Sequence, residues 1–368
     1  MIEIAGKYNT AFVHSDIIEL TCFTQLLDVC NCKLFENETI HVMPDVHAGK
    51  GSVIGFTSTF NNQERVCPNI IGVDIGCGVD VYNLGNIDLD LQQFDYLVKT
   101  NVPSGTEVRT TNRLLESTVE QMLFQLRSPL PGLYFERALN SIGTLGGGNH
   151  FLEIDVDRET NEHFLVIHSG SRQLGKLVAE YYQKIATQYE NEGKSLYSVS
   201  GVDKDNYLHD MKIAQQYAAI NRMTIADVIC KHLNIPVDLY CTSVHNYIDF
   251  DDNIIRKGAI SAHTGQKIVI PLNMRDGIIL ATGKQTSDTN YSAPHGAGRL
   301  FSRGQAKQQI TLEQFQQSMV GIYSSCITSS TIDESPFAYK DSETIINQVS
   351  ELVDIDRIIK PIYNFKGK

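Results

Sequence analysis

The chain has 368 residues, of which 42% are hydrophobic and 20% are charged, a balance typical of a globular protein with a substantial core. No apolar run approaches the length that crosses a bilayer, and the N-terminus lacks the basic and apolar regions of a secretory signal, so we expect a cytoplasmic protein without a membrane partner. The formal net charge of -12 argues against a long, non-specific nucleic-acid groove.

The predicted elements begin with a helix over 17–27, for which Ser15 and Asp16 are candidate N-caps. Strand-like runs follow between glycine-rich corners, at 39–43, 52–60, 69–75 and 79–84. Helical patterns then precede a pair of strands: the helices at 88–99, 113–127 and 134–142, the strands at 151–156 and 163–168. The rest is predicted as helices at 174–191 and 206–233, strands at 253–260, 266–270 and 277–284, and helices near 311–323 and 341–354.

No internal repeat, low-complexity tract or flexible linker interrupts this order. The pattern therefore predicts an α/β fold of mixed sheets with inserted helices, organised as one domain over 1–368. The eight cysteines form no C-x-x-C pair, which argues against a zinc ribbon or a disulfide scaffold.

Basic residues concentrate in one segment of this acidic chain. Between Arg256 and Lys307, eight basic residues stand against two acidic ones. Such an island suits a confined site for a polyanion, although a solvated surface is an equally common explanation.

Five of the 11 histidines lie in corners rich in Gly, Asn, Asp or Pro, where α/β proteins assemble sites from distant segments. They are His47, His150, His168, His245 and His295. Another five are ordinary surface or core-edge histidines by default: His14, His163, His209, His232 and His263.

A carboxylate and a thiol in GVDIGCG, Asp74 and Cys77, extend this set toward a metal site. Together with His150, His168 and His245 they form a borderline-soft donor set that could hold Mn, Fe, Co, Ni or Zn, and one thiolate could bridge two ions. The competing interpretation is a buried small thiol and a turn-capping aspartate.

The nucleotide signatures GxxxxGK[ST], GxGxxG after a strand and KxDG are absent from the sequence, which disfavours a P-loop kinase and a lysine-adenylylating ligase. GGGNH and HGAGR could still present backbone N–H groups to phosphate oxygens, which is a weak signal for each motif alone.

His295 stands apart because small residues surround it, and Arg299 and Arg303 follow at spacings that share a helix face if a helix starts after the glycines. An imidazole can attack phosphorus to form a phosphoramidate while arginines neutralise the phosphates. On residue chemistry alone, His295 is either this nucleophile or a further metal ligand.

Taken in order, these motifs resemble the RtcB family of RNA-splicing ligases over nearly the full chain. The matching runs are MPDVHAGKG (43–51), GVDIGCG (72–78), LGGGNHFLE (145–153), HSGSR (168–172), SVHN (243–246), RKGAISA (256–262), HGAGRLFSR (295–303), AYKD (338–341) and FKG (365–367).

The resemblance implies a deep central metal and nucleotide pocket and a GTP- and Mn²⁺-dependent RNA ligase. Such an enzyme joins a 3′-phosphate or 2′,3′-cyclic phosphate end to a 5′-hydroxyl end. His295 would take up GMP from GTP and pass it to the RNA 3′-end. The resemblance also implies the ligands of two Mn²⁺ ions, with Cys77 as the bridge: Asp74, Cys77, His150, His168 and His245.

The nucleotide contacts that the resemblance implies are Asn149, Glu153, Asn246, Gly296, Ala297, Gly298 and Lys366, with Tyr339 as a weaker candidate. The chain departs from the family at PLNMRDG (271–277), where the family has a PGSMG-like turn. Asn273 is the candidate replacement for a serine contact there, and the altered turn leaves the strictness of GTP preference open.

Three alternatives remain beside the ligase. A paralogue could cap RNA or DNA 3′-ends by guanylylation without sealing them, and a metal-dependent phosphoesterase could act on cyclic or terminal phosphates. A non-catalytic RNA-binding module is suggested only by the basic island. An archease-like activator is a candidate partner of the ligase.

Overall fold

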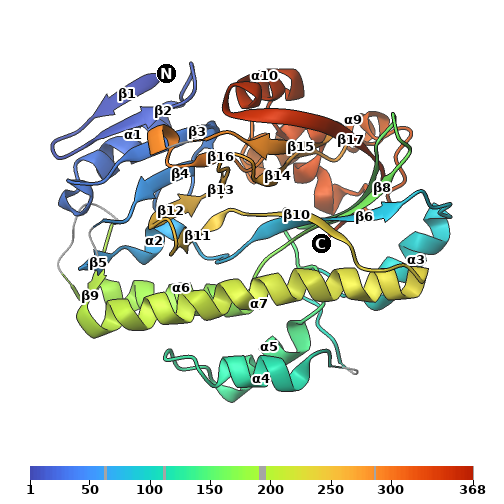
Figure 1. The fold of residues 1–368 in the computed structure, drawn as a ribbon, viewed down its shortest axis with the longest axis horizontal. Helices are drawn as coiled ribbons and strands as arrows, with labels where there is room; N and C mark the ends of the chain where they lie inside the picture. Colours follow the sequence, from blue (N-terminus) through green and yellow to red (C-terminus); the bar gives the residue numbers. More distant parts are fainter. Residues whose placement is uncertain (62–63, 111–112, 190–195, 286, 368) are drawn as a thin grey trace.

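Two antiparallel-rich sheets dominate the computed structural model, which describes residues 1–61, 64–110, 113–189, 196–285 and 287–367 (Figure 1). The first sheet has six strands, in the order β1 (Ile2–Ala5), β2 (Thr10–Val13), β3 (Ile40–His47), β4 (Ile54–Thr59), β12 (Ile254–Lys257) and β11 (Asn246–Asp249). Its only parallel pair is β2 with β3, within the described residues.

The second sheet is wholly antiparallel in its described pairs. Its seven strands run in the order β10 (Leu239–Val244), β6 (Gly78–Gly85), β8 (His163–Ser169), β7 (Phe151–Val156), β17 (Val353–Lys366), β15 (Gly277–Gly283) and β14 (Lys267–Asn273). Two short pairs complete the strands: β13 (Ala259–Ser261) with β16 (Ser292–Pro294), and β5 (Arg65–Val66) with β9 (Val199–Ser200).

Ten α-helices are present in the described chain. They are α1 (Leu20–Cys30), α2 (Pro68–Ile71), α3 (Leu91–Asn101), α4 (Glu116–Leu123), α5 (Gly132–Ser141), α6 (Arg172–Ala186), α7 (Gly201–Leu233), α8 (Arg303–Gln309), α9 (Leu312–Ser318) and α10 (Ser342–Leu352). Short 3₁₀ turns lie between them: η1 (Lys33–Phe35), η2 (Ser287–Thr289), η3 (Ser329–Glu334) and η4 (Pro336–Ala338). None of the described helices is both long and apolar enough to cross a membrane.

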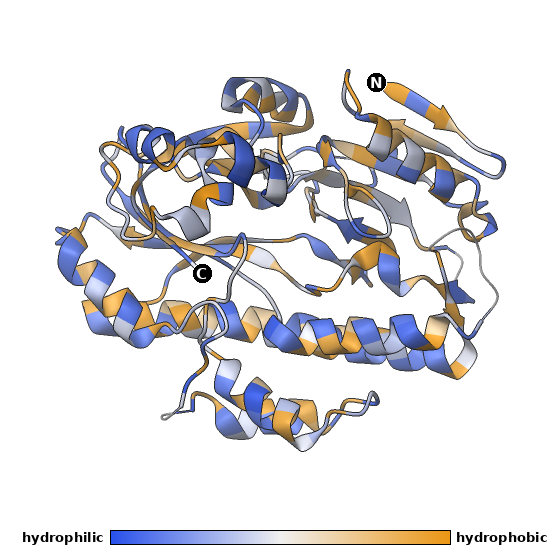
Figure 2. Cartoon of the chain, turned by 180° about the vertical axis from the view of Figure 1, so that it is seen from behind, coloured by the Kyte–Doolittle hydropathy of each residue, from blue (hydrophilic) through white to orange (hydrophobic). Residues whose placement is uncertain are grey.

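Helix α7 ties the two sheets together. Tyr207 and Met211 in its first half belong to the core of the first sheet, whereas Ile225 and Ile229 belong to the core of the second. Figure 1 shows α7 running the length of the molecule beside α6, and in Figure 2 apolar and polar residues alternate along both helices. The helix ends where Asn234 adopts a left-handed conformation, a common helix stop.

The predicted α/β class with mixed sheets and inserted helices is therefore confirmed. The segment predicted as a strand at 69–75 is wrong, because Pro68 occupies the first helical position of α2 and Gly72, at φ 97°, ends that helix. The first helix begins at Leu20 rather than at 17, and the Ser15 hydroxyl donates to the Ile17 carbonyl instead of capping it.

Strand β17 is the largest element that the sequence did not predict. Pro361 lies inside it, and proline normally excludes a central strand because it lacks an N–H. The pairing with β7 shifts register between Pro361 and Tyr363, and this irregularity accommodates the proline.

Candidate functional site

A cavity of about 680 Å³ opens where strands of both sheets end. From the first sheet it is lined by His47 at the end of β3 and Asn246 at the start of β11. The second sheet contributes His168 of β8, Asn273 of β14 and Lys366 of β17. Residues that are distant in the sequence thus line the same cavity.

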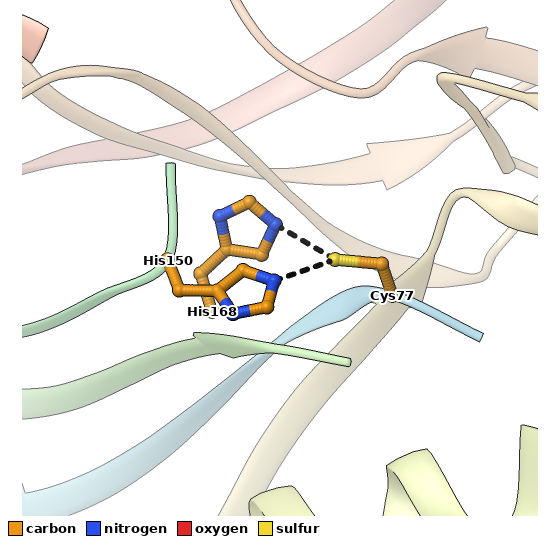
Figure 3. Close-up of side chains that lie close together, drawn as sticks. All are labelled: Cys77, His150 and His168. Atoms are coloured by element: carbon orange, nitrogen blue, oxygen red, sulfur yellow. Dashed lines mark hydrogen bonds between the residues drawn. The ribbon is translucent and has the colours of Figure 1, made fainter. Parts of the chain in front are cut away.

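Five donor side chains lie close together at one end of this cavity. The Cys77 Sγ is 3.4 Å from His150 Nε2 and 3.2 Å from His168 Nε2, and both rings turn toward the sulfur (Figure 3). Asp74 Oδ2 lies 3.0 Å from His150 Nε2, and His245 Nε2 lies 3.4 Å from His168 Nε2. The ligand atoms of Cys77, His150 and His168 all fall within 4.8 Å of one another.

The turn that carries Asp74 and Cys77 is fixed by its glycine. Gly76 has φ 75°, and a Cβ there would come within 2.8 Å of the Gln215 Cα on α7. Its N–H donates to the Asn246 carbonyl at 2.8 Å. The turn therefore packs directly on α7 and brings its thiol to the ends of β7 and β8.

The donor set fits a metal ion on its own chemistry. Burial lowers the pKa of His168 and His245 well below the usual range, so both rings are neutral and keep a lone pair for coordination. Burial raises the pKa of the Cys77 thiol well above its usual value, a penalty that a cation would offset. His150 Nδ1 lies 2.9 Å from the Leu145 carbonyl, which orients its Nε2 toward the cluster.

His295 stands next to this cluster, with its ring centroid 4.9 Å from that of His245. Its Nδ1 lies 2.6 Å from Asp45 Oδ2, and its backbone N–H donates to the same oxygen at 3.2 Å. The Nε2 atom has no hydrogen bond to the described residues. The carboxylate thus fixes the ring and leaves one nitrogen available.

Sequence reasoning did not assign Asp45, although it lies inside the matched run MPDVHAGKG. In this run the sequence points to His47 instead. Its Nδ1 lies 2.9 Å from the Asp45 carbonyl, and burial lowers its pKa to about 4, so it is a neutral ring on the cavity wall. A carboxylate at the end of a buried strand was the available signal for Asp45.

Another part of the cavity wall combines a carboxylate, an ammonium group and two aromatic rings. Burial raises the pKa of Glu153 to about 7, and this carboxylate accepts a hydrogen bond from the Asn364 amide. Lys366 Nζ lies 4.9 Å from the Phe151 ring centroid. The Tyr339 ring lies beside Arg299, whose guanidinium carbon is 5.2 Å from the ring centroid.

All nine residues expected to contact a nucleotide line this cavity: Asn149, Glu153, Asn246, Asn273, Gly296, Ala297, Gly298, Tyr339 and Lys366. Among the expected metal ligands, Asp74, Cys77, His168 and His245 line it, and His150 lies directly behind them.

Asn273 is held within its own turn. Its amide N–H groups donate to Asp276 Oδ2 and Ser342 Oγ, and its Oδ1 accepts from the backbone N–H groups of Arg275 and Asp276. Its hydrogen-bonding capacity is therefore taken up by the PLNMRDG turn and by Ser342 at the start of α10.

Two expectations about charge are corrected. No helix starts after the glycines of HGAGR, because α8 begins only at Arg303, yet Arg299 and Arg303 still converge on Glu334. The basic island is also largely neutralised: of its eight basic residues, seven form ion pairs with acidic side chains, namely Arg256, Lys267, Arg275, Lys284, Arg299, Arg303 and Lys307.

Comparison with known proteins gives a consistent result. A model of the family described as tRNA-splicing ligase RtcB matches residues 25–367. The chain is 32% identical to the RNA-splicing ligase RtcB1 of Escherichia coli strain ATCC 25922, over 89% of this chain and 90% of that protein. It is 30% identical to the RNA-splicing ligase RtcB of E. coli K12 over the same shares, and 28% identical to the tRNA-splicing ligase RtcB of Aeropyrum pernix over 89% of this chain and 87% of that protein.

Proposed function

This chain belongs to the RtcB family, and we propose that it is an RNA ligase that works through a covalent His295–GMP intermediate. The substrates would be GTP and two RNA ends, one carrying a 3′-phosphate or a 2′,3′-cyclic phosphate and the other a 5′-hydroxyl. The observation that carries the proposal is the position of His295, which is bonded to Asp45 and lies beside the donor cluster.

The chemistry at His295 follows from its hydrogen bond. With the proton on Nδ1 and shared with Asp45, Nε2 keeps the lone pair that attacks the α-phosphorus of GTP. A phosphorus–nitrogen bond forms, the bond to the β-phosphate oxygen breaks, and pyrophosphate leaves. Asp45 stabilises the positive charge that develops on the ring.

The following steps move the activated phosphate onto RNA. A 2′,3′-cyclic phosphate would first be hydrolysed to the 3′-phosphate, with water breaking the bond to the 2′-oxygen. An oxygen of the RNA 3′-phosphate then attacks the bound GMP, which breaks the phosphorus–nitrogen bond and restores neutral His295. The 5′-hydroxyl of the second end then attacks the 3′-phosphorus, loses its proton and displaces GMP. One phosphodiester bond results per GTP consumed.

We propose that the resident metal is Mn²⁺ and that Cys77 would be one of the residues that hold two such ions. The other ligands would be Asp74, His150, His168 and His245, each of which lies within 3.4 Å of another donor of the set. When bound, the ions would supply Lewis-acid charge to the reacting phosphates.

The guanosine is proposed to bind beside Phe151. The carboxylate of Glu153 would accept from the base N1–H and 2-amino groups, and Lys366 would donate to the 6-oxygen. Backbone N–H groups of Gly296 to Gly298 would receive phosphate oxygens. An archease-like activator, a cytoplasmic location and a one-domain organisation over 1–368 stay predictions.

The test is mass spectrometry of the purified protein after incubation with GTP and Mn²⁺. We expect a mass increase of one GMP, mapped to His295 by peptide analysis, and no adduct in His295→Ala. Absence of an adduct in the wild-type protein, or an equal adduct in His295→Ala, would falsify the proposal. His47→Gln is the matched control, because it also removes a cavity imidazole but should keep the adduct.

A metal-dependent phosphoesterase is the second candidate, because the donor cluster is complete without His295. It predicts that an RNA 2′,3′-cyclic phosphate is hydrolysed with Mn²⁺ alone, without GTP and without joined product. Capping without sealing would instead give a guanylylated RNA 3′-end that persists when a 5′-hydroxyl strand is added.

A further inference from the structure

Behind the nucleotide end of the cavity, one buried carboxylate contacts four side chains of the cavity wall. Glu334 is 2% exposed and does not line the cavity, but its four partners do. The distances from its carboxylate oxygens are 2.6 Å to Tyr339 Oη, 3.2 Å to Arg299 Nη1, 3.3 Å to Arg303 Nη1 and 3.2 Å to Lys366 Nζ.

We propose that Glu334 is a positioning residue for nucleotide binding: it holds Tyr339, Arg299 and Lys366 in the places from which they would contact GTP. This inference rests on the proposed function. Glu334 acts through its neighbours and touches neither the reacting atoms nor His295, so it is not a catalytic residue.

The local fold fixes Glu334 independently of these partners. It is the last residue of η3, whose start is closed by a reciprocal hydrogen-bond pair between Thr328 and Thr331. The Thr331 hydroxyl also donates to the Cys326 carbonyl. A carboxylate on such a braced turn can orient long, flexible side chains, because it restricts their rotamers before the ligand arrives.

The charge balance leaves the wall attractive to an anion. Four cations, Arg299, Arg303, Lys307 and Lys366, share the two carboxylates of Glu334 and Asp333, so this group of side chains keeps a net positive charge. Burial raises the pKa of Glu334, but Lys366, Arg303 and Arg299 outweigh this and lower it overall, so the group is ionised. Asp333 takes a further share of Arg303 and pairs with Lys307.

Asp333 offers a matched control, because it is the neighbouring acid on the same turn. Asp333→Asn and Glu334→Gln remove the same charge, but Asp333 forms no side-chain bond to Tyr339 or Lys366 among the described contacts. The only bond between Arg299 and Asp333 is to the Asp333 backbone carbonyl, and Asp333→Asn keeps that carbonyl. An effect of net charge alone would be equal in the two variants.

The experiment measures the Kd for GTP with Mn²⁺ in a His295→Ala background, and KM and kcat for guanylylation in the His295 protein. We expect Glu334→Gln to raise Kd and KM about tenfold or more and to change kcat by less than about threefold. Asp333→Asn should leave the Kd for GTP and the KM for guanylylation within about threefold of the values of the parent protein. Equal effects of the two variants, an unchanged Kd in Glu334→Gln, or a lower kcat at unchanged KM would each overturn the inference.

Thermal unfolding of each variant shows whether it is folded. If Glu334→Gln fails to fold, Glu334→Asp keeps the charge but shortens the reach by one methylene, and a wild-type Kd in that variant would also refute the positioning role. A wild-type protein that forms no GMP adduct would overturn the proposed function instead, so the two failures are distinguishable.

Discussion

One ring nitrogen of His295 is bonded to Asp45, and the other has no hydrogen bond to the described part of the chain, which is the arrangement that an imidazole nucleophile needs. Asp45 is fully buried at the end of β3 and also accepts the His295 backbone N–H, so a single carboxylate sets both the position of the residue and the orientation of its ring. The proton that it holds on Nδ1 decides which nitrogen can attack.

Asp45→Asn is expected to slow formation of the GMP adduct by roughly a hundredfold or more, because an amide neither fixes the tautomer nor stabilises the ring cation. Single-turnover labelling with GTP measures this rate. Manganese content should be unchanged, because Asp45 is no proposed ligand. A rate within about twofold of wild type would show that the hydrogen bond is only structural.

Two carboxyl groups on β7, Glu153 and Asp155, are buried in surroundings that disfavour their charged form. Neither carboxylate oxygen of Asp155 has a hydrogen-bond partner among the described residues. Burial, with Glu153 nearby, raises the pKa of Asp155 well above its usual value. A carboxyl that holds its proton more tightly in the folded than in the unfolded chain makes stability fall as pH rises.

Asp155→Asn should therefore flatten the decline in the free energy of unfolding between about pH 5 and about pH 8, and should stabilise the protein at the upper end by about 1–3 kcal/mol. Urea unfolding across that range measures the slope. Asp157→Asn is the control with the opposite sign, because Asp157 pairs with Arg357 at 2.8 Å and its loss should destabilise. A slope unchanged by Asp155→Asn would mean that this residue is ionised.

At the scale of single residues, the sequence points to the candidate metal ligands more clearly than to the buried acids that position other side chains of the site. Cys77, His150 and His168 could be found because thiols and imidazoles in glycine-rich corners are chemically conspicuous. Asp45 offered a weaker signal, a carboxylate in a buried strand, and Glu334 offered none, because the role of a buried acid depends on the side chains that it contacts in the fold. The partners of Glu334 include Lys366, 32 residues away in sequence.

Among the elements, α7 has the most direct connection to the donor cluster. Arg222, on this helix, pairs with Asp80 at 2.8 Å and donates to the carbonyls of Gly76 and Ser169 at 2.9 and 3.1 Å. Gly76 directly precedes Cys77, and Ser169 directly follows His168. One guanidinium thus ties two ligand-bearing segments to the helix.

Arg222→Met is expected to cost about 3–5 kcal/mol of folding free energy, because it leaves Asp80 buried without its cation. It should also reduce bound manganese by loosening both segments. Urea unfolding and metal analysis measure the two effects. Gln216→Met, at an exposed position of the same helix, should change stability by less than about 0.5 kcal/mol. Equal behaviour of the two variants would contradict the role of Arg222.

The prediction of helices and strands failed where single turn-forming residues or pairing with distant strands outweigh the local sequence pattern. The apolar run NIIGVDI looks like a strand, but Pro68 and Gly72 turn it into a short helix and the turn that carries Asp74. β17 contains a proline with four charged residues before it, which is a weak strand pattern, but its pairing with β7 on one side and β15 on the other determines its conformation. Periodic helices such as 206–233 were predicted because their pattern is local.

For the whole molecule, the proposed metal site would link segments that are far apart in sequence. Asp74 and Cys77 precede β6, His150 directly precedes β7, His168 lies on β8, and His245 lies between β10 and β11. An ion bound to all of them would favour the folded state over the unfolded chain, in which these ligands are dispersed.

Saturating Mn²⁺ should therefore raise Tm by several degrees, in line with about 2.7 kcal/mol at a hundredfold excess over Kd. A chelator should reverse the shift, and Cys77→Ser should abolish most of it. Differential scanning calorimetry measures both. Cys241→Ser, which alters another buried thiol outside the cavity, should keep the full shift even if its Tm is lower. A shift that survives in Cys77→Ser would exclude this cysteine as a ligand.

β17 lies between β7 and β15 in the seven-stranded sheet, so this sheet is complete only when the last strand of the described chain has paired. β7 pairs with its hairpin partner β8 on one side, but its other edge stays open until it pairs with β17, which begins about 200 residues later in the sequence, at Val353. Long-range antiparallel pairing of this kind is slow to form, and an open strand edge attracts other chains until it is covered. We therefore expect refolding from denaturant to be slow and its yield to fall with protein concentration.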